Sequence, residues 1–422
     1  MSSVIVCSGP HDGHVSPMLG VARHLIDRGH RVRFLTGPAY QDAVKAVGAE
    51  FLPLGPGAEY GTEPSAATGV QAIREGIRGL VIEPARGQYL PLEAAIAAEH
   101  TDAVLAEVTF MGAATLSRLP RHQRPAVIAC GILPLTLSSP DCAPYGSGLA
   151  PGKGKAARLR NRVLNWMVSD VVLKDSQQQV DALTRELVGV GLDGLFILDW
   201  ARRAELIAQF TVQEFEYPRS DAPDNLRFFG PMSRHAASAS VTPKPDWWEL
   251  DGSRPVVYVT QGTVSNEDFT ALVGPTLEGL ADEDVTVVVS TGRRPLSALP
   301  PLPANARAAE FLPDAELLPK VAVYITNGGY GGLHYAMENG VPIVVAGDTE
   351  DKPEGAARVA WAGVGINLKT GRPKPAAIRH AVRKVLADGR YRAGSQRIGA
   401  AIAASPGVDG LLDEMEAMLR KV

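Results

Sequence analysis

Two histidines, His11 and His14, follow a short apolar run at residues 4–7 that is typical of a β-strand. A histidine side chain is near neutral at pH 7 and can take a proton from a substrate hydroxyl. Ser16 is expected to cap the helix that comes next, and Pro17 to lie in its first turn. A lone histidine more often only hydrogen-bonds its own loop, but a position where a strand ends favours catalysis. The pattern therefore predicts a general base in this turn.

A glycine-rich turn forms the second candidate, again between an expected strand and an expected helix. Glycines carry no Cβ, so backbone N–H groups can approach an anion closely, and the start of the helix adds partial positive charge. A diphosphate would fit such a turn. The spacing is not that of a dinucleotide-binding GxGxxG motif. A tight turn alone would need small residues, but four glycines in five positions exceed that need. The segment comprises Thr326, Asn327, Gly328, Gly329, Tyr330, Gly331 and Gly332.

Two weaker candidates follow other expected strands of the second half. Carboxylates at a strand end can accept hydrogen bonds from sugar hydroxyls, and a lysine there could meet a phosphate. By itself such a loop is usually only solvated. The acidic loop comprises Asp348, Thr349, Glu350, Asp351 and Lys352, and a small turn of weak specificity comprises Gln261, Gly262 and Thr263.

Three patterns resemble functional motifs but favour a structural reading. Residues 148–155 are rich in glycine and lysine, but Ser147 and Gly154 stand where a P-loop needs Gly and Ser or Thr. The acidic triplet 282–284 precedes a strand, which is the wrong edge of a sheet for a metal site. The basic residues between 153 and 162 lack interleaved aromatics, so we interpret them as a solvated helix face.

Composition limits the classes of function. The 422 residues include 42 Lys+Arg and 46 Asp+Glu, which gives a net charge of 42 − 46 = −4, with no block of like charge. This balance argues against a nucleic-acid partner. No apolar run is long enough to span a membrane. Three cysteines without metal spacing favour buried core positions and a cytoplasmic location.

The elements that would position these residues alternate between strand and helix. Such β-α-β alternation predicts a parallel sheet covered on both faces, with ligands at the carboxyl ends of the strands. Residues 232–245 are small, polar and proline-containing, and the alternation starts afresh after them. We therefore expect an α/β protein of two tandem Rossmann-like doubly wound domains, 1–231 and 246–422, facing across a cleft. Strands are expected at residues 4–7, 31–35, 51–54, 103–105, 126–130, 256–260, 285–290, 322–326 and 343–346.

Almost the whole chain resembles the nucleotide-sugar-dependent glycosyltransferases of the GT-B fold, and in particular the macrolide and natural-product UDP-glycosyltransferase-like enzymes. Residues 13–36, GHVSPMLGVARHLIDRGHRVRFLT, match the GHxxP opening of that family. Residues 326–359, TNGGYGGLHYAMENGVPIVVAGDTEDKPEGAARV, match its donor-binding signature. Two independent motifs in the right order, one in each half, make the resemblance specific.

The resemblance implies an inverting, metal-independent transfer of a hexose from a UDP- or dTDP-sugar. The nucleotide sugar is then a co-substrate, and no other cofactor is expected. His14 would be the general base, and Glu107 would be its acidic partner. Asn327, the glycine-rich backbone and Thr263 would stabilise the leaving diphosphate, and Phe311 would stack on the nucleotide base. The expected donor-binding set is Gly13, Gln261, Gly262, Thr263, Phe311, Asn327, Gly328, Gly329, Tyr330, Gly331, Gly332, Glu350, Asp351 and Lys352.

The chain departs from the family pattern at several donor-site positions. Asn327 stands where many relatives have His, Lys352 and Gly355 replace Gln and Asn, Tyr335 replaces a ribose-binding Glu, and Asp314 replaces a Gln. These changes leave the choice between UDP and dTDP sugars open.

The acceptor is expected on the first domain, along residues 57–88 and 135–151, and family function suggests a lipophilic polyketide, macrolide or phenol. We expect a monomer or homodimer whose domains close on the donor and whose last helix packs back on the first domain. The main alternative is a non-catalytic relative that acts as a binding or activating partner. An epimerase or a membrane-lipid transferase is a third reading, which the GHxxP element and the lack of an evident basic-apolar helix disfavour.

Overall fold

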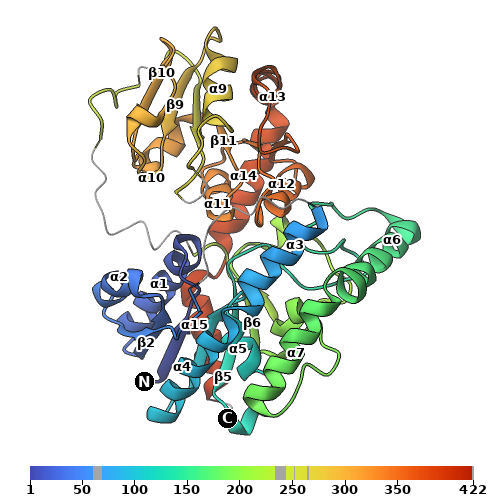
Figure 1. Cartoon of the computed structure of the whole chain (residues 1–422). Coiled ribbons are helices and arrows are strands. Elements are labelled where there is room, and N and C mark those ends of the chain that lie inside the picture. The colour runs from blue at the N-terminus through green and yellow to red at the C-terminus, as the bar shows by residue number, and fades with distance from the viewer. Residues whose placement is uncertain (60–68, 233–243, 251, 264–265, 421–422) are drawn as a thin grey trace.

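A computed structural model describes residues 1–59, 69–232, 244–250, 252–263 and 266–420. It shows two parallel sheets, one formed by the first half of the chain and one by the second (Figure 1). The first sheet has seven strands in the order β3-β2-β1-β4-β5-β6-β7, and the second has six in the order β10-β9-β8-β11-β12-β13. The strands are β1 (Ser3–Cys7), β2 (Arg31–Thr36), β3 (Glu50–Pro53), β4 (Ala103–Glu107), β5 (Ala126–Gly131), β6 (Leu206–Gln209), β7 (Leu226–Phe228), β8 (Val256–Thr260), β9 (Thr286–Ser290), β10 (Ala306–Ala309), β11 (Val321–Thr326), β12 (Ile343–Val345) and β13 (Gly365–Asn367).

Helices cover both faces of each sheet, as the alternation predicts. The helices are α1 (Asp12–Asp27), α2 (Gln41–Ala46), α3 (Gly69–Ile77), α4 (Ala85–Ala98), α5 (Met111–Leu116), α6 (Gly154–Met167), α7 (Lys174–Val188), α9 (Val273–Leu280), α10 (Asp314–Leu317), α11 (Tyr330–Glu338), α12 (Lys352–Trp361), α13 (Pro375–Ala387), α14 (Gly389–Ala404) and α15 (Gly407–Leu419). Wide π-helical turns extend α3 and α6 at their C-terminal ends. Strands such as β1 and β5 are apolar throughout because they are buried on both faces.

The expected strands are all present, with ends that differ by at most two residues, and the two-sheet α/β architecture is confirmed. Strands β6, β7, β10 and β13 were not anticipated. Each is three or four residues long, too short for a clear alternation of apolar residues.

The start of the first helix differs from the expectation. Helix α1 begins at Asp12 with His11 as its N-cap, so Ser16 is not the cap and His14 lies in the first helical turn. Pro17 lies further inside, where its missing N–H cannot complete the helical ladder to Gly13. The helix ends at Asp27 with Arg28 as its C-cap, and Gly29 follows with a φ of +82°, which suits glycine.

The chain crosses between the two halves twice. The predicted linker, residues 232–245, falls mostly on positions 233–243, which lie outside the described residues. After α14, helix α15 returns to the first sheet and buries Leu411 and Met415 in the same core as Met18 of α1 (Figure 1). Arg28 of α1 also pairs with Asp413 of α15, at 2.6 Å. In the described part of the chain, no helix is both long and apolar enough to cross a membrane.

Candidate active site

Both sheets have their strand-order reversal at the centre, and the candidate residues gather there. In the first sheet β1 lies between β2 and β4, and in the second β8 lies between β9 and β11. After the two central strands of each sheet, β1 and β4 or β8 and β11, the chain continues in opposite directions along the sheet, which opens a crevice at the carboxyl ends of those strands. His14 follows β1 and Glu107 ends β4, while Gln261 follows β8 and Asn327 follows β11.

His14 and Glu107 form a partly buried pair across the first reversal. Nδ1 of His14 lies 3.3 Å from Oε1 of Glu107, with the two side chains 15% and 0% exposed. The carboxylate also accepts hydrogen bonds from the backbone N–H of Gly9 at 3.2 Å and of Thr109 at 2.6 Å. The Thr109 hydroxyl donates to it at 2.7 Å and lies 3.3 Å from Nδ1 of His14. These donors hold the carboxylate in one orientation against the imidazole.

The pair is electrostatically coupled. Burial disfavours the charged form of His14, but the charge and hydrogen bond of Glu107 outweigh it, so the pKa of His14 is raised. Burial also opposes ionisation of Glu107, yet His14 and Thr109 hold the pKa of that carboxyl below its ordinary value. With Nδ1–H directed at the carboxylate, the lone pair of a neutral imidazole lies on Nε2, ready to accept a proton.

His11 lies beside this pair but has different electrostatics. Its ring packs edge-on against that of His14, with centroids 5.5 Å apart. Burial and the neighbouring His14 lower the pKa of His11 to about 4, so it stays neutral at pH 7. Nδ1 of His14 lies 3.3 Å from the Glu107 carboxylate, which can stabilise an imidazolium on that ring.

The glycine-rich turn of the second domain joins β11 to α11. Gly328 has a φ of +101°, and its N–H donates to the Thr326 hydroxyl at 3.2 Å. Nδ2 of Asn327 donates to the backbone carbonyl of Gln261 at 2.6 Å, which ties the two turns at the reversal together. Helix α11 starts at Tyr330 with Gly329 as N-cap, so the first-turn N–H groups, which have no acceptor within the helix, lie at this edge.

Not every side chain of the predicted donor set faces this edge. The Gln261 side chain accepts from the N–H groups of Leu272 and Val273, so it holds the segment before α9. The Tyr330 ring is buried and stacks on Phe215, with centroids 6.2 Å apart. Only their backbone groups remain for an anion. Thr263 is exposed, and Phe311 is 42% exposed.

Phe311 lies beside a cation: the guanidinium of Arg293 is 5.6 Å from its ring centroid. Asp314, on the same side of the second sheet, accepts a hydrogen bond from the Tyr258 hydroxyl at 2.9 Å. Burial raises the pKa of Asp314 to about 6. An exposed aromatic ring with a cation beside it provides a face on which a planar base can stack.

The acidic loop between β12 and α12 faces the histidines of the first domain. Asp351 and Glu350 both contribute to raising the pKa of His14, and Glu350 acts on His11 as well. Nζ of Lys352 donates to Glu350 at 2.6 Å and to the Thr349 hydroxyl at 3.2 Å, so much of its charge is used within the loop. Burial raises the pKa of Asp351 to about 6 despite the nearby Lys352. The acidic loop at residues 348–352 therefore lies close enough to the two histidines to act on them electrostatically.

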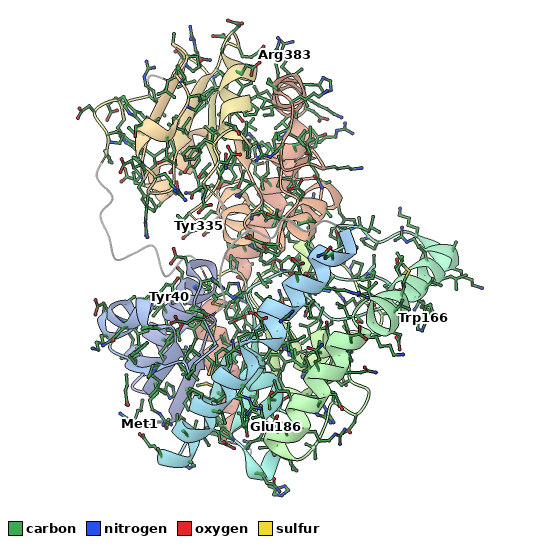
Figure 2. All side chains as sticks on the ribbon, viewed as in Figure 1. Met1, Tyr40, Trp166, Glu186, Tyr335 and Arg383 are labelled. Atoms are coloured by element: carbon green, nitrogen blue, oxygen red, sulfur yellow. The ribbon has the colours of Figure 1, made fainter. Side chains whose placement is uncertain are left out.

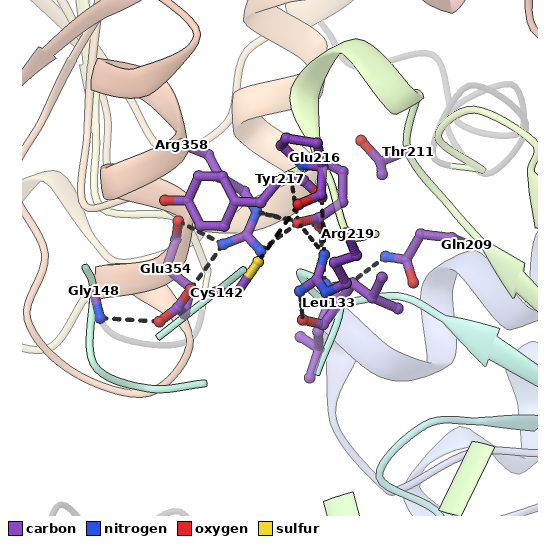
Figure 3. Close-up of polar contacts among 12 residues, drawn as sticks. Leu133, Cys142, Gly148, Gln209, Thr211, Glu216, Tyr217, Arg219, Glu354 and Arg358 are labelled. Atoms are coloured by element: carbon purple, nitrogen blue, oxygen red, sulfur yellow. Dashed lines mark hydrogen bonds and ion pairs between the residues drawn. The ribbon is translucent and has the colours of Figure 1, made fainter. Parts of the chain in front are cut away.

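A buried ionic cluster, missed at the sequence level, joins the two domains (Figure 3). Arg358 of α12 bonds Glu216 of the first domain at 2.6 Å, with both side chains 1% exposed. Glu354 bonds Arg358 at 2.8 Å and also accepts from the N–H groups of Gly146 and Gly148, at 3.0 and 2.9 Å. Alternating charges on a helix are usually solvated, so the sequence carried no signal for this burial.

The structural interpretations of the acidic triplet and of the cysteines are confirmed. The acidic triplet 282–284 connects α9 to β9 and pairs at the surface with arginines, and all three cysteines are buried and unpaired. Within the described residues no group of three or more His, Cys, Asp or Glu could hold a metal ion.

Two facing doubly wound domains, each built on a parallel sheet, define the GT-B fold. Solved structures share it: a glycosyltransferase of kitacinnamycin superposes with a TM-score of 0.76 at 22% identity over 99% of both chains. A spinosyn rhamnosyltransferase, SpnG, superposes with a TM-score of 0.69 at 19% identity, covering 99% of this chain and all of the other.

Sequence relatives identify the family to which the chain belongs within this fold class. Residues 275–418 match the family of the erythromycin biosynthesis protein CIII-like C-terminal domain. The chain is 41% identical to the 4′-demethylrebeccamycin synthase of Lentzea aerocolonigenes over 99% of both chains. It is also 34% identical to UDP-glycosyltransferase 2 of Phaeomoniella chlamydospora, over 92% of this chain and 90% of the other. The chain therefore belongs to the natural-product, UDP-glycosyltransferase-like family of GT-B enzymes, and it is a glycosyltransferase.

Proposed function

We propose that this glycosyltransferase moves a hexose, with inversion, from a UDP- or dTDP-sugar to a hydroxyl of a lipophilic polyketide, macrolide or phenolic acceptor. The observation that carries the proposal is the His14–Glu107 pair, on which Glu350 and Asp351 of the second domain act electrostatically, with the glycine-rich turn packed beside the same loop. A base on one domain and an anion-binding turn on the other match what a single displacement at the anomeric carbon needs.

The chemistry assigns each side one task. Nε2 of His14 takes the proton of the acceptor hydroxyl, and Glu107 stabilises the imidazolium that forms. The acceptor oxygen bonds to the anomeric carbon as the bond from that carbon to the diphosphate breaks. The electron pair leaves with the diphosphate, whose charge meets the first-turn N–H groups of α11. One displacement inverts the anomeric centre.

Support for the substrates comes from relatives. One relative is named a UDP-glycosyltransferase, and the spinosyn rhamnosyltransferase was crystallised with thymidine diphosphate and with spinosyn aglycone. The two donor bases therefore both remain in the proposal. Within the proposed acceptor stretch 135–151, the N–H groups of Gly146 and Gly148 donate to Glu354 of the second domain, which supports an acceptor near the donor. Residues 60–68 of the other proposed stretch, 57–88, lie outside the described residues.

The test combines binding with turnover. Titration calorimetry with UDP and with dTDP is expected to show binding of at least one nucleotide, and the matching glucose donor is expected to be turned over on a panel of phenols and macrolides. Binding of neither nucleotide would contradict the proposal and favour the non-catalytic partner. Nucleotide binding with a product of retained configuration would contradict the single displacement.

A further inference from the structure

Helix α6 is mounted on the first domain by its polar side. Asn161 is fully buried, and its Nδ2 donates to the carbonyl of Pro140 at 3.2 Å. One turn later, Nδ2 of Asn165 donates to the carbonyls of Ser139 and Cys142, at 3.1 and 3.0 Å. A surface helix normally turns its apolar stripe to the core, and α6 does the opposite.

The face of α6 opposite these asparagines is apolar and exposed. The exposed fractions are 62% for Leu159, 50% for Val163, 59% for Trp166 and 40% for Met167. Spacings of four, three and one place these residues on one side of a helix. Figure 1 shows α6 projecting at the edge of the first domain, and Figure 2 shows Trp166 at that edge. The described part of the chain does not cover this face.

Basic residues border the apolar face. Helical periodicity places Lys155, Arg158 and Arg162 along one side and Arg160 along the other. Of these, Arg158 pairs with Asp141 at 3.1 Å. No Asp or Glu occurs between Cys142 and Ser169, although the whole chain has a net charge of −4. The chain therefore concentrates positive charge around its most exposed apolar stripe.

We propose that α6 docks this enzyme on an anionic phospholipid bilayer, with Leu159, Val163 and Trp166 entering the interface and the basic borders meeting lipid phosphates. A helix with one apolar face, a Trp and flanking Lys and Arg is the form that lies in a membrane interface. Helix α6 is thus the basic-apolar helix that was not evident from the sequence, because its apolar side could not be known to be exposed. A two-fold contact with a second copy would set these like-charged borders against each other. A bilayer needs no shape complementarity, which suits a helix that projects. The proposal goes beyond glycosyl transfer and does not depend on it.

Co-sedimentation with vesicles tests the docking. The full chain is expected to bind vesicles of phosphatidylcholine with phosphatidylserine, to bind phosphatidylcholine vesicles far less, and to be released by salt. The triple variant Leu159→Gln, Val163→Gln, Trp166→Gln should bind at least about tenfold more weakly, because it removes the apolar contact. The pair Lys155→Gln and Arg162→Gln should lose roughly fivefold per charge.

The control replaces three exposed leucines elsewhere, Leu296, Leu302 and Leu386, by Gln, and it should bind like the unmodified chain. The α6 positions are exposed, so thermal unfolding midpoints of all variants should agree. No binding to anionic vesicles, or equal binding by the triple variant and the control, would overturn the proposal. A dimer in sedimentation velocity that the triple variant abolishes would overturn it too, by assigning the face to a second copy. If the chain binds no anionic vesicles, an acidic protein replaces the bilayer as the expected occupant of this face.

Discussion

At the residue level, the site depends on a carboxylate that burial alone would neutralise. Glu107 is fully buried, and it stays ionised because His14, Thr109 and the backbone of Gly9 supply charge and hydrogen bonds. The partnership of His14 and Glu107 was implied by the family resemblance, and the two side chains lie 3.3 Å apart because β1 and β4 are neighbouring central strands. The role of Thr109 could not be predicted, since its contacts arise from the shape of the turn after β4.

Replacing Glu107 by Gln tests this coupling through pH dependence. His14 must be neutral to act as base, so kcat/KM of the unmodified enzyme should fall as the pH drops below the raised pKa of His14. Without the negative charge that pKa falls, so in Glu107→Gln the acidic limb should move to lower pH. The plateau should fall by about 10²-fold. A full pH profile of kcat/KM measures both changes, and a limb that stays in place or moves upward would count against the pair.

At the level of elements, the two strand-order reversals organise the site. The glycine-rich turn between β11 and α11 could be predicted from its composition and its place after a strand. That α6 packs through its polar side could not be predicted. Its asparagines bond residues 139–142, which have no periodic pattern in the sequence. Tyr330 lies in the glycine-rich motif, yet its ring turns to the core because helical geometry points it toward Phe215.

A methyl group at Gly328 tests the turn. The φ of +101° is strained for alanine, and the added Cβ would lie 3.0 Å from Cγ2 of Val345. We expect Gly328→Ala to raise the Kd for the bound nucleotide about tenfold or more, since a shift of this turn moves the N–H groups that face the diphosphate. Titration calorimetry gives the value.

Gly29→Ala is the matched control, because Gly29 also has a positive φ of +82° but lies at the end of α1, away from this turn. It should bind nucleotide normally. Equal affinities for both variants and the unmodified chain would exclude the turn from donor binding.

At the level of the whole molecule, the contacts that join the domains include helix α15 in the core of the first sheet and the buried cluster of Glu216, Glu354 and Arg358. The return of the last helix could be expected from its apolar face. The cluster could not, because Glu216 is separated from Arg358 by 142 residues. Since Glu354 also accepts hydrogen bonds from the N–H groups of Gly146 and Gly148, the cluster ties the proposed acceptor stretch 135–151 to the second domain.

Glu216→Gln should destabilise the molecule strongly. It leaves Arg219 and Arg358 buried with less negative charge, and breaking such a buried network typically costs about 3–5 kcal/mol. The thermal unfolding midpoint measures the loss. Asp27→Asn, which breaks a surface pair with Arg23 at 57% exposure, should cost under about 1 kcal/mol. Midpoints that fall equally in both variants would show that the cluster does not stabilise the domain interface.

The most direct test of the account is turnover by His14→Ala. If His14 is the base, kcat/KM with the donor and acceptor identified by the panel should fall by about 10²–10⁴-fold, while the Kd of the nucleotide stays unchanged. His24→Ala, on the same helix, where Nδ1 of His24 lies 2.9 Å from the backbone carbonyl of Gly20, should keep near-normal turnover. Turnover of His14→Ala within a factor of about three of the unmodified enzyme would contradict the central claim.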